Sequence, residues 1–158
     1  MKYIIYTDGG YSQMNDIGAF AYVMLDDKGN VFKKNAWKIE KETNNRAELK
    51  AIIAGVHHLP MDATDVRIIS DSQYALNTLS GKWQRKSNTD LFPIYDKIIK
   101  ERRLNVVYEW VRGHDGNQYN EMCDKMCSRG CRNGLERRIC EIQKEIINNL
   151  KNFLWLII

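Results

Sequence analysis

Three short runs at the start of the chain are rich in apolar, aromatic and β-branched residues, a pattern typical of β-strands. The first run covers residues 2–8 and ends at Asp8, and the next two cover residues 17–25 and 31–39. Between the second and third runs stands DDKGN, a sequence typical of hairpin turns. We therefore predict three consecutive strands, of which the second and third form a hairpin.

From Asn44 the apolar positions take the spacing of an amphipathic helix, which is expected to end before Pro60. The residues that show this spacing are Leu49, Ile52, Ile53 and Val56. The later patterns predict a strand at 65–70, helices at 72–80 and 89–103, a strand at 105–111, and a helix at 119–131 after a loop. This order predicts an α/β fold of the mixed α+β kind, in which helices pack on a mixed sheet.

The composition fits one globular domain, because the chain has 158 residues and 44% of them are hydrophobic. A net charge of +4 permits nucleic-acid binding without demonstrating it. No signal-peptide pattern precedes Asp8, and no apolar run reaches the roughly 18 residues that a membrane span needs. We therefore expect no membrane partner and a cytoplasmic location.

Four cysteines occur near the C-terminal end, at Cys123, Cys127, Cys131 and Cys140. The first three recur at every fourth residue, so a helix would place them along one face. A metal site is the alternative, but the spacing matches no common zinc pattern. We predict that they are small apolar core positions, and free thiols favour a reducing compartment.

Four acidic residues stand where the predicted elements begin or end. Asp8 ends the first strand, Glu48 lies in the first turn of the first long helix, Asp71 follows the fourth strand, and Asp124 lies on the helix after the last strand. Each has a structural alternative. Asp8 can begin a turn, Glu48 can complete a capping box with Asn45, Asp71 can cap the next helix, and Asp124 can be a solvated helix residue.

A functional interpretation depends on these four carboxylates coming together. In a mixed sheet, the ends of adjacent strands and the start of a flanking helix can converge on one rim. Clustered carboxylates repel one another unless divalent cations neutralise them, and oxygen ligands suit Mg²⁺ or Mn²⁺. Two such ions are a common device for cleaving phosphodiester bonds.

Four motifs carry a resemblance to a known family. YTDGG, TNNRAEL, SDSQYALN and VRGHDGNQYNEMCD occur in the order and context of type 1 ribonuclease H, which cuts the RNA strand of RNA–DNA hybrids. The resemblance runs from about residue 2 to residue 128. It implies a five-stranded mixed sheet flanked by helices, two bound Mg²⁺ ions with Mn²⁺ as a substitute, and products with 5′-phosphate and 3′-hydroxyl ends.

The resemblance also assigns roles to the acidic residues. It implies that Asp8 is shared by both ions, that Asp124 completes the site of the ion that activates water, and that Glu48 and Asp71 hold the other ion. His114, in RGHDG, is similar to the family's active-site histidine, which is thought to assist proton transfer and release of the cleaved phosphate. A lone histidine in a loop is otherwise more often inert.

Recognition of the ribose 2′-hydroxyl requires groups that both donate and accept hydrogen bonds, as Asn and Gln amides do. Asn44, Asn45 and Gln73 match family positions that contact the hybrid in the minor groove. Thr43, together with Asn44, resembles the pocket that grips a phosphate of the DNA strand. The alternative for the asparagines is helix capping, and both roles can coexist.

Two segments depart from the pattern of many relatives. Where they carry a long basic protrusion, this chain has only GKWQRKSNTD, in which Lys82, Trp83, Arg85 and Lys86 would contact the DNA strand. A solvated turn is the alternative. The second departure is the segment at 135–158, which follows a catalytic domain at 1–134.

We expect the segment at 135–158 to form an extra C-terminal helix, with Ile139, Ile142, Ile146 and Leu150 on one face. We favour packing of this helix on the core of a monomer over a dimer formed through the segment. Two other interpretations of the chain are a non-catalytic module that binds hybrids and the nuclease domain of a reverse transcriptase. The carboxylate set argues against the first, and the start at Met1 directly before a strand favours a free-standing protein over the second.

Overall fold

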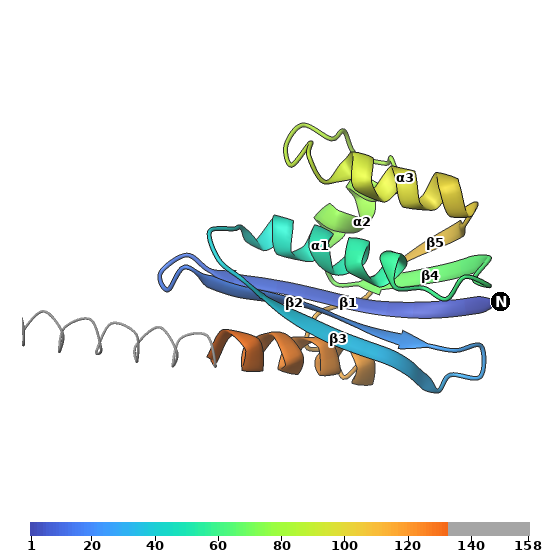
Figure 1. Cartoon of the computed structure of the whole chain (residues 1–158). Coiled ribbons are helices and arrows are strands. Elements are labelled where there is room, and N and C mark those ends of the chain that lie inside the picture. The colour runs from blue at the N-terminus through green and yellow to red at the C-terminus, as the bar shows by residue number, and fades with distance from the viewer. Residues whose placement is uncertain (133–158) are drawn as a thin grey trace, which may run out of the picture.

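The computed structural model describes residues 1–132 and shows one five-stranded sheet with helices on both faces (Figure 1). The strands are β1 (Lys2–Ser12), β2 (Ile17–Leu25), β3 (Val31–Ile39), β4 (Asp65–Ser70) and β5 (Asn105–Trp110). The helices are α1 (Asn44–His57), α2 (Gln73–Leu79) and α3 (Phe92–Arg102), and residues 118–132 form a further helix. The predicted fold class is therefore confirmed.

The sheet has the order β3-β2-β1-β4-β5. The pairs β1–β2 and β2–β3 are antiparallel, whereas β1–β4 and β4–β5 are parallel, which makes the sheet mixed. Parallel neighbours require crossover connections, and α1 supplies the first while α2 and α3 supply the second. As a result, the C-terminal ends of β1, β4 and β5 lie near one another.

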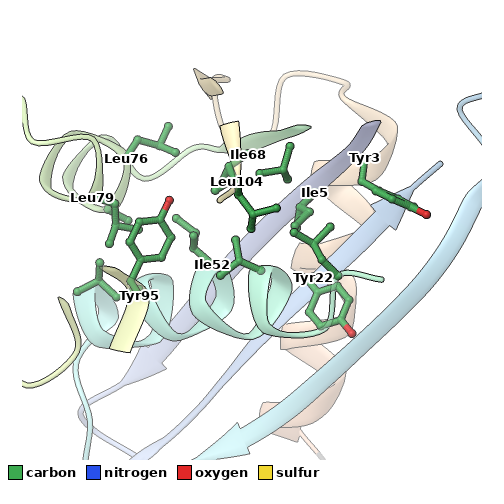
Figure 2. Packing of buried hydrophobic residues seen from close by; sticks show 14 of the residues in the cluster. Tyr3, Ile5, Tyr22, Ile52, Ile68, Leu76, Leu79, Tyr95 and Leu104 are labelled. Atoms are coloured by element: carbon green, nitrogen blue, oxygen red, sulfur yellow. The ribbon is translucent and has the colours of Figure 1, made fainter. Parts of the chain in front are cut away.

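The main core lies between the sheet and the three labelled helices. Figure 2 shows Ile5, Tyr22 and Ile68 of the sheet packed with Ile52 of α1, and all four side chains are fully buried. Burial of this many large apolar side chains stabilises the fold and fixes α1 against β1 and β2.

The helix at residues 118–132 covers the opposite face of the sheet (Figure 1). Cys123 and Cys127 are buried there among apolar residues of β2, so their predicted role as small core positions is confirmed. Burial raises the pKa of both thiols, and Cys127 donates a hydrogen bond from Sγ to the backbone oxygen of Asp8 at 3.4 Å. Cys131 is half-buried, and Cys140 lies outside the described residues.

Two predicted boundaries were wrong. The strand β1 does not end at Asp8 but continues to Ser12, because Gly9–Ser12 go on pairing with β2. The helix α3 begins at Phe92 rather than at residue 89, and Pro93 occupies its first turn, where a missing N–H is tolerated. Asp90 therefore lies before the helix.

Three other expectations concern the end of the chain or its surroundings. The boundary at residue 134 and the helical extension at 135–158, with its fold-back or dimer role, lie outside the described residues. Within residues 1–132, no helix is both long enough and apolar enough to cross a membrane.

Candidate active site

Three carboxylates meet at the point where the pairing of β1 with β4 ends. The last residue pair of these parallel strands is Thr7 with Ser70, so Asp8 and Asp71 are the next residues along neighbouring strands. Together with Glu48 of α1 they form a cluster in which one oxygen of each carboxylate lies within 4.8 Å of the others. The convergence predicted from the sequence is therefore observed for three of the four acids.

Glu48 reaches the cluster because α1 lies against the backbone of β1. A Cβ atom on Gly9 would lie 2.4 Å from the carbonyl carbon of Ala47 and 2.5 Å from the backbone nitrogen of Glu48. Non-bonded carbon atoms approach to about 3.5 Å, so only glycine allows this contact. The glycine that follows Asp8 thus places a second carboxylate beside it.

The clustered carboxylates disfavour one another's charged forms. Burial, followed by the charges of Asp71 and Asp124, raises the pKa of Asp8 to about 6. Burial and the charges of Asp8 and Asp71 also raise the pKa of Glu48 well above its usual value. Within the described part of the chain, no group hydrogen-bonds the buried Oε2 atom of Glu48.

These features fit a site for a divalent cation. Three carboxylate oxygens close together provide the hard ligands that Mg²⁺ and Mn²⁺ prefer. A cation between them would give the buried Glu48 oxygen a partner. It would also offset the burial and the mutual repulsion that raise the pKa values of Asp8 and Glu48.

The structure rules out the capping alternatives for Glu48 and Asp71. Thr43, not Asn45, is the N-cap of α1, and its hydroxyl accepts a hydrogen bond from the backbone N–H of Arg46. Glu48 lies in the second turn of α1, so its predicted place in the first turn was wrong. Ser72 caps α2 by accepting a hydrogen bond from the N–H of Ala75, which leaves the Asp71 side chain available.

Asp124 and His114 lie beside the three-carboxylate cluster rather than in it. The side chain of Asp124 is 41% exposed, and its Oδ2 atom is 4.0 Å from Nδ1 of His114, which is 79% exposed. Asp124 is close enough for its charge to raise the pKa of Asp8. One further acid and one histidine, both exposed to solvent, thus lie next to the cluster.

The loop that carries His114 is packed against Asp71. A Cβ on Gly113 would lie 2.6 Å from Oδ2 of Asp71, and Trp110 donates a hydrogen bond from Nε1 to the backbone oxygen of Asp71 at 2.9 Å. His114 itself has a positive φ of 56°, a conformation unusual for a residue other than glycine. These contacts hold the histidine near the carboxylates although its ring is exposed.

The residues predicted to contact the ribose 2′-hydroxyl groups of the substrate lie close in sequence to the site. Asn44 and Asn45 occupy the first turn of α1 and are exposed, and Gln73 is the exposed first residue of α2, two residues after Asp71. The Oδ1 atom of Asn44 accepts a hydrogen bond from the backbone N–H of Tyr11 at 2.6 Å, which leaves its NH₂ group to donate. The hydroxyl of Thr43 serves as the helix cap.

The basic segment before α3 (residues 81–90) contains both exposed side chains and one that packs inward. Lys82, Trp83 and Lys86 are exposed, with 47% of Trp83 accessible. Arg85 instead turns inward, donates to the backbone oxygens of Thr78 and Leu79 and pairs with Asp96. These contacts hold Arg85 against α2 and α3, so the solvated-turn alternative does not apply to it, and we leave it out of the substrate surface proposed below.

Sequence reasoning missed the residues that position the site without contacting a ligand. Gly9 and Gly113 matter because a side chain would push away Glu48 or Asp71. The pair of glycines within a strand pattern was the available signal for Gly9, since such glycines often mark close backbone approach. For the hydrogen bond from Trp110 to Asp71, the sequence contained no signal.

Comparisons with known proteins agree with this geometry. Residues 1–132 match the family model of RNase H. The ribonuclease H of Pseudomonas fluorescens is 34% identical over 140 residues, a match that covers 80% of this chain and 89% of the relative. The ribonuclease H of Anaeromyxobacter dehalogenans is 31% identical over 150 residues, which cover 83% and 80% of the two chains.

The fold also matches solved structures. The crystal structure of LC11-RNase H1 in complex with an RNA/DNA hybrid superposes with a TM-score of 0.74 at 26% identity, over 84% of this chain and 99% of that chain. Family match, relatives above 30% identity and fold all agree: the chain belongs to the RNase H family of nucleases.

Proposed function

We propose that this protein hydrolyses the RNA strand of RNA–DNA hybrids with two bound Mg²⁺ ions, for which Mn²⁺ would substitute, leaving 5′-phosphate and 3′-hydroxyl ends. The observation that carries the proposal is the cluster of Asp8, Glu48 and Asp71. The raised pKa values of Asp8 and Glu48 and the unpartnered Oε2 atom of Glu48 fit a cation site. The similarity to an RNase H1 that was crystallised with an RNA/DNA hybrid supports the choice of substrate.

The chain supplies four groups that would hold the ions. The charges of both Asp71 and Asp124 act on Asp8, which suits a ligand shared by two ions. Glu48 and Asp71 would complete one site and Asp124 the other. When bound, the ions would activate a water molecule and neutralise the charge that develops on the phosphate.

The residues around the cluster would select and orient the substrate. The amides of Asn44, Asn45 and Gln73 carry donors and acceptors that suit the 2′-hydroxyl groups of an RNA strand. Thr43 and Asn44 lie where a phosphate of the DNA strand would approach the N-terminus of α1, whose free N–H groups favour anions. The exposed part of the basic segment, Lys82, Trp83 and Lys86, would contact the DNA strand farther along.

The proposal is tested by incubating the full chain with a labelled RNA–DNA hybrid, with single-stranded RNA, RNA duplex and DNA duplex as controls. We expect cleavage of the RNA strand of the hybrid alone in Mg²⁺, and no cleavage in EDTA, because the carboxylates would then hold no cation. Sequencing gels that resolve the end groups would identify the 5′-phosphate. If the protein binds the hybrid but does not cut it in Mg²⁺ or Mn²⁺, it is a binding module.

His114 offers a second test of the same site. We expect His114→Ala to lower kcat by about 10²-fold, the usual effect of losing a group that transfers protons. Because the His114 side chain is 79% exposed, its removal should leave the melting temperature within about 2 °C of wild type.

The matched control for His114 is His57→Ala, since His57 is exposed on α1 and outside the site. Steady-state kinetics of both variants show whether His114 contributes to kcat. Equal rates for His114→Ala and His57→Ala would remove His114 from the mechanism.

A further inference from the structure

An ion pair ties the first turn of α1 to the segment before α3. Arg46 donates from Nη1 and Nη2 to the two carboxylate oxygens of Asp90, both at 2.8 Å, and from Nε to Glu42 at 2.7 Å. The Arg46 side chain is 25% exposed, whereas that of Asp90 is 62% exposed. The Arg46 guanidinium lowers the pKa of Asp90 to about 2, so the pair stays charged under ordinary assay conditions.

Arg46 stands within the part of α1 that borders the active site. It directly follows Asn45 and precedes Glu48 by two residues, and its backbone N–H donates to the capping hydroxyl of Thr43. A shift of the Arg46 backbone would therefore also affect the helix cap and the adjacent Asn45.

Asp90 stands at the end of the basic segment. Two residues earlier, the Nδ2 atom of Asn88 donates to the hydroxyl of Tyr74 on α2 at 2.8 Å. One residue later, Leu91 is buried in the main core. The basic segment is therefore held to α2 by Asn88 and to α1 by Asp90, and the Arg46–Asp90 pair joins two parts of the site that are 44 residues apart.

We propose that Arg46 and Asp90 are positioning residues that fix the distance between the RNA-reading amides of α1 and the basic segment that meets the DNA strand. This inference rests on the function proposed above. The two strands of a hybrid duplex are held at a set separation, so two protein surfaces that each contact one strand must keep a matching separation. A bidentate arginine–carboxylate pair supplies this constraint, because its two parallel hydrogen bonds fix orientation as well as distance.

The Arg46–Asp90 pair is suited to positioning α1 relative to the basic segment rather than to stabilising the folded protein. Ion pairs with an exposed partner add little to the free energy of unfolding. The chain contains a comparable pair, Arg85 with Asp96, whose side chains are 28% and 52% exposed. That pair holds the basic segment to α3 and does not reach α1, so it provides a matched control.

The test compares Asp90→Asn, which keeps the shape but removes the charge, with Asp90→Glu and Asp96→Asn. For Asp90→Asn we expect KM for the hybrid to rise about 10-fold while kcat changes less than about 2-fold, because contacts to the duplex are lost but the carboxylate cluster is not. Asp90→Glu should recover most of the affinity, and Asp96→Asn should leave KM within about 2-fold.

A binding measurement separates positioning from catalysis. In an Asp8→Asn background, which holds the hybrid uncut, fluorescence anisotropy should show Kd for the labelled hybrid rising by about the same factor in the Asp90→Asn variant. The melting temperatures of Asp90→Asn and Asp96→Asn should agree within about 2 °C.

The inference is overturned if Asp90→Asn leaves KM and Kd unchanged, or if Asp96→Asn raises them equally. A fall in kcat that parallels a lower melting temperature would also overturn it, since it would show a purely structural role. Absence of cleavage by the wild-type chain would instead contradict the proposed function, so the two failures are distinguishable.

Discussion

Asp8→Asn is expected to abolish cleavage of the hybrid and, at the same time, to stabilise the metal-free protein. Asp8 belongs to the carboxylate cluster and is affected by the charges of Asp71 and Asp124. Losing a ligand that we propose is shared by two ions should lower kcat by about 10³-fold or more. The amide keeps the shape of the carboxylate and removes one negative charge from a crowded, partly buried site.

The gain in stability follows from the direction of the pKa shift. The pKa of Asp8 is raised from 3.8 to about 6 in the folded protein, so the folded state binds a proton more readily than the unfolded state. Stability of the metal-free protein therefore falls as pH rises from about 4 to about 6, and the loss persists at pH 7. A shift of this size corresponds to about 3 kcal/mol, so Asp8→Asn should recover about 1–3 kcal/mol.

Thermal unfolding in EDTA across this pH range checks the prediction. The wild type should melt several degrees below Asp8→Asn at pH 7, and the two curves should converge near pH 4. Added Mg²⁺ should raise the melting temperature of the wild type but not that of the variant. Asp27→Asn, in the exposed hairpin between β2 and β3, is the matched control and should change neither property.

Turnover within about 10-fold of wild type in Asp8→Asn would contradict its role as a shared ligand. Equal stability of the two proteins at pH 7 in EDTA would contradict the argument from repulsion, even if activity were lost. The two measurements therefore test the chemistry of the site and its electrostatics separately.

Most of the fold followed from the period of the apolar residues. The hairpin of β2 and β3 and the helix α1 were predicted within a residue or two, because each has a long pattern and a clear turn or cap. The end of β1 was missed because Asp8-Gly9 has the chemistry of a turn, whereas hydrogen bonds to β2 carry the strand on to Ser12. Here pairing with a distant segment outweighed the local preference.

The candidate site was predictable as a set of residue types but not as a geometry. Asp71 was placed correctly at the end of β4, since a carboxylate after a buried strand lies at the rim of the sheet. The sequence did not show that Asp124 would stand apart from the other three acids, nor that Arg85 would turn toward Asp96. Both facts depend on the packing of side chains across the molecule, which periodicity does not encode.

Gly9→Ala is expected to weaken both the fold and the active site. The added Cβ would lie 2.4 Å from the carbonyl carbon of Ala47, 2.6 Å from its oxygen and 2.5 Å from the nitrogen of Glu48. All three are backbone atoms of α1, so no rotation of a side chain relieves the overlap, and α1 must move by about 1 Å. Overpacking of this kind should lower the free energy of unfolding by about 3 kcal/mol.

The same movement should open the active site, because Glu48 travels with α1 while Asp8 and Asp71 stay with the sheet. A displacement of about 1 Å at a catalytic group can cost about 10²-fold in rate, so we expect kcat to fall by about that factor in folded Gly9→Ala. Isothermal titration with Mg²⁺ should show weaker binding than in the wild type.

Gly10→Ala is the matched control, since a Cβ on Gly10 would meet no atom of residues 1–132 within 4 Å. It should leave activity intact and, by reducing the freedom of the unfolded chain, stabilise the protein by about 0.5 kcal/mol. Chemical denaturation and Mg²⁺ titration of both variants distinguish the effect of overlap with the α1 backbone from the effect of adding a methyl group to β1. If Gly9→Ala matched Gly10→Ala in both, α1 would not need its backbone contact with β1, and the explanation given above for the position of Glu48 would be wrong.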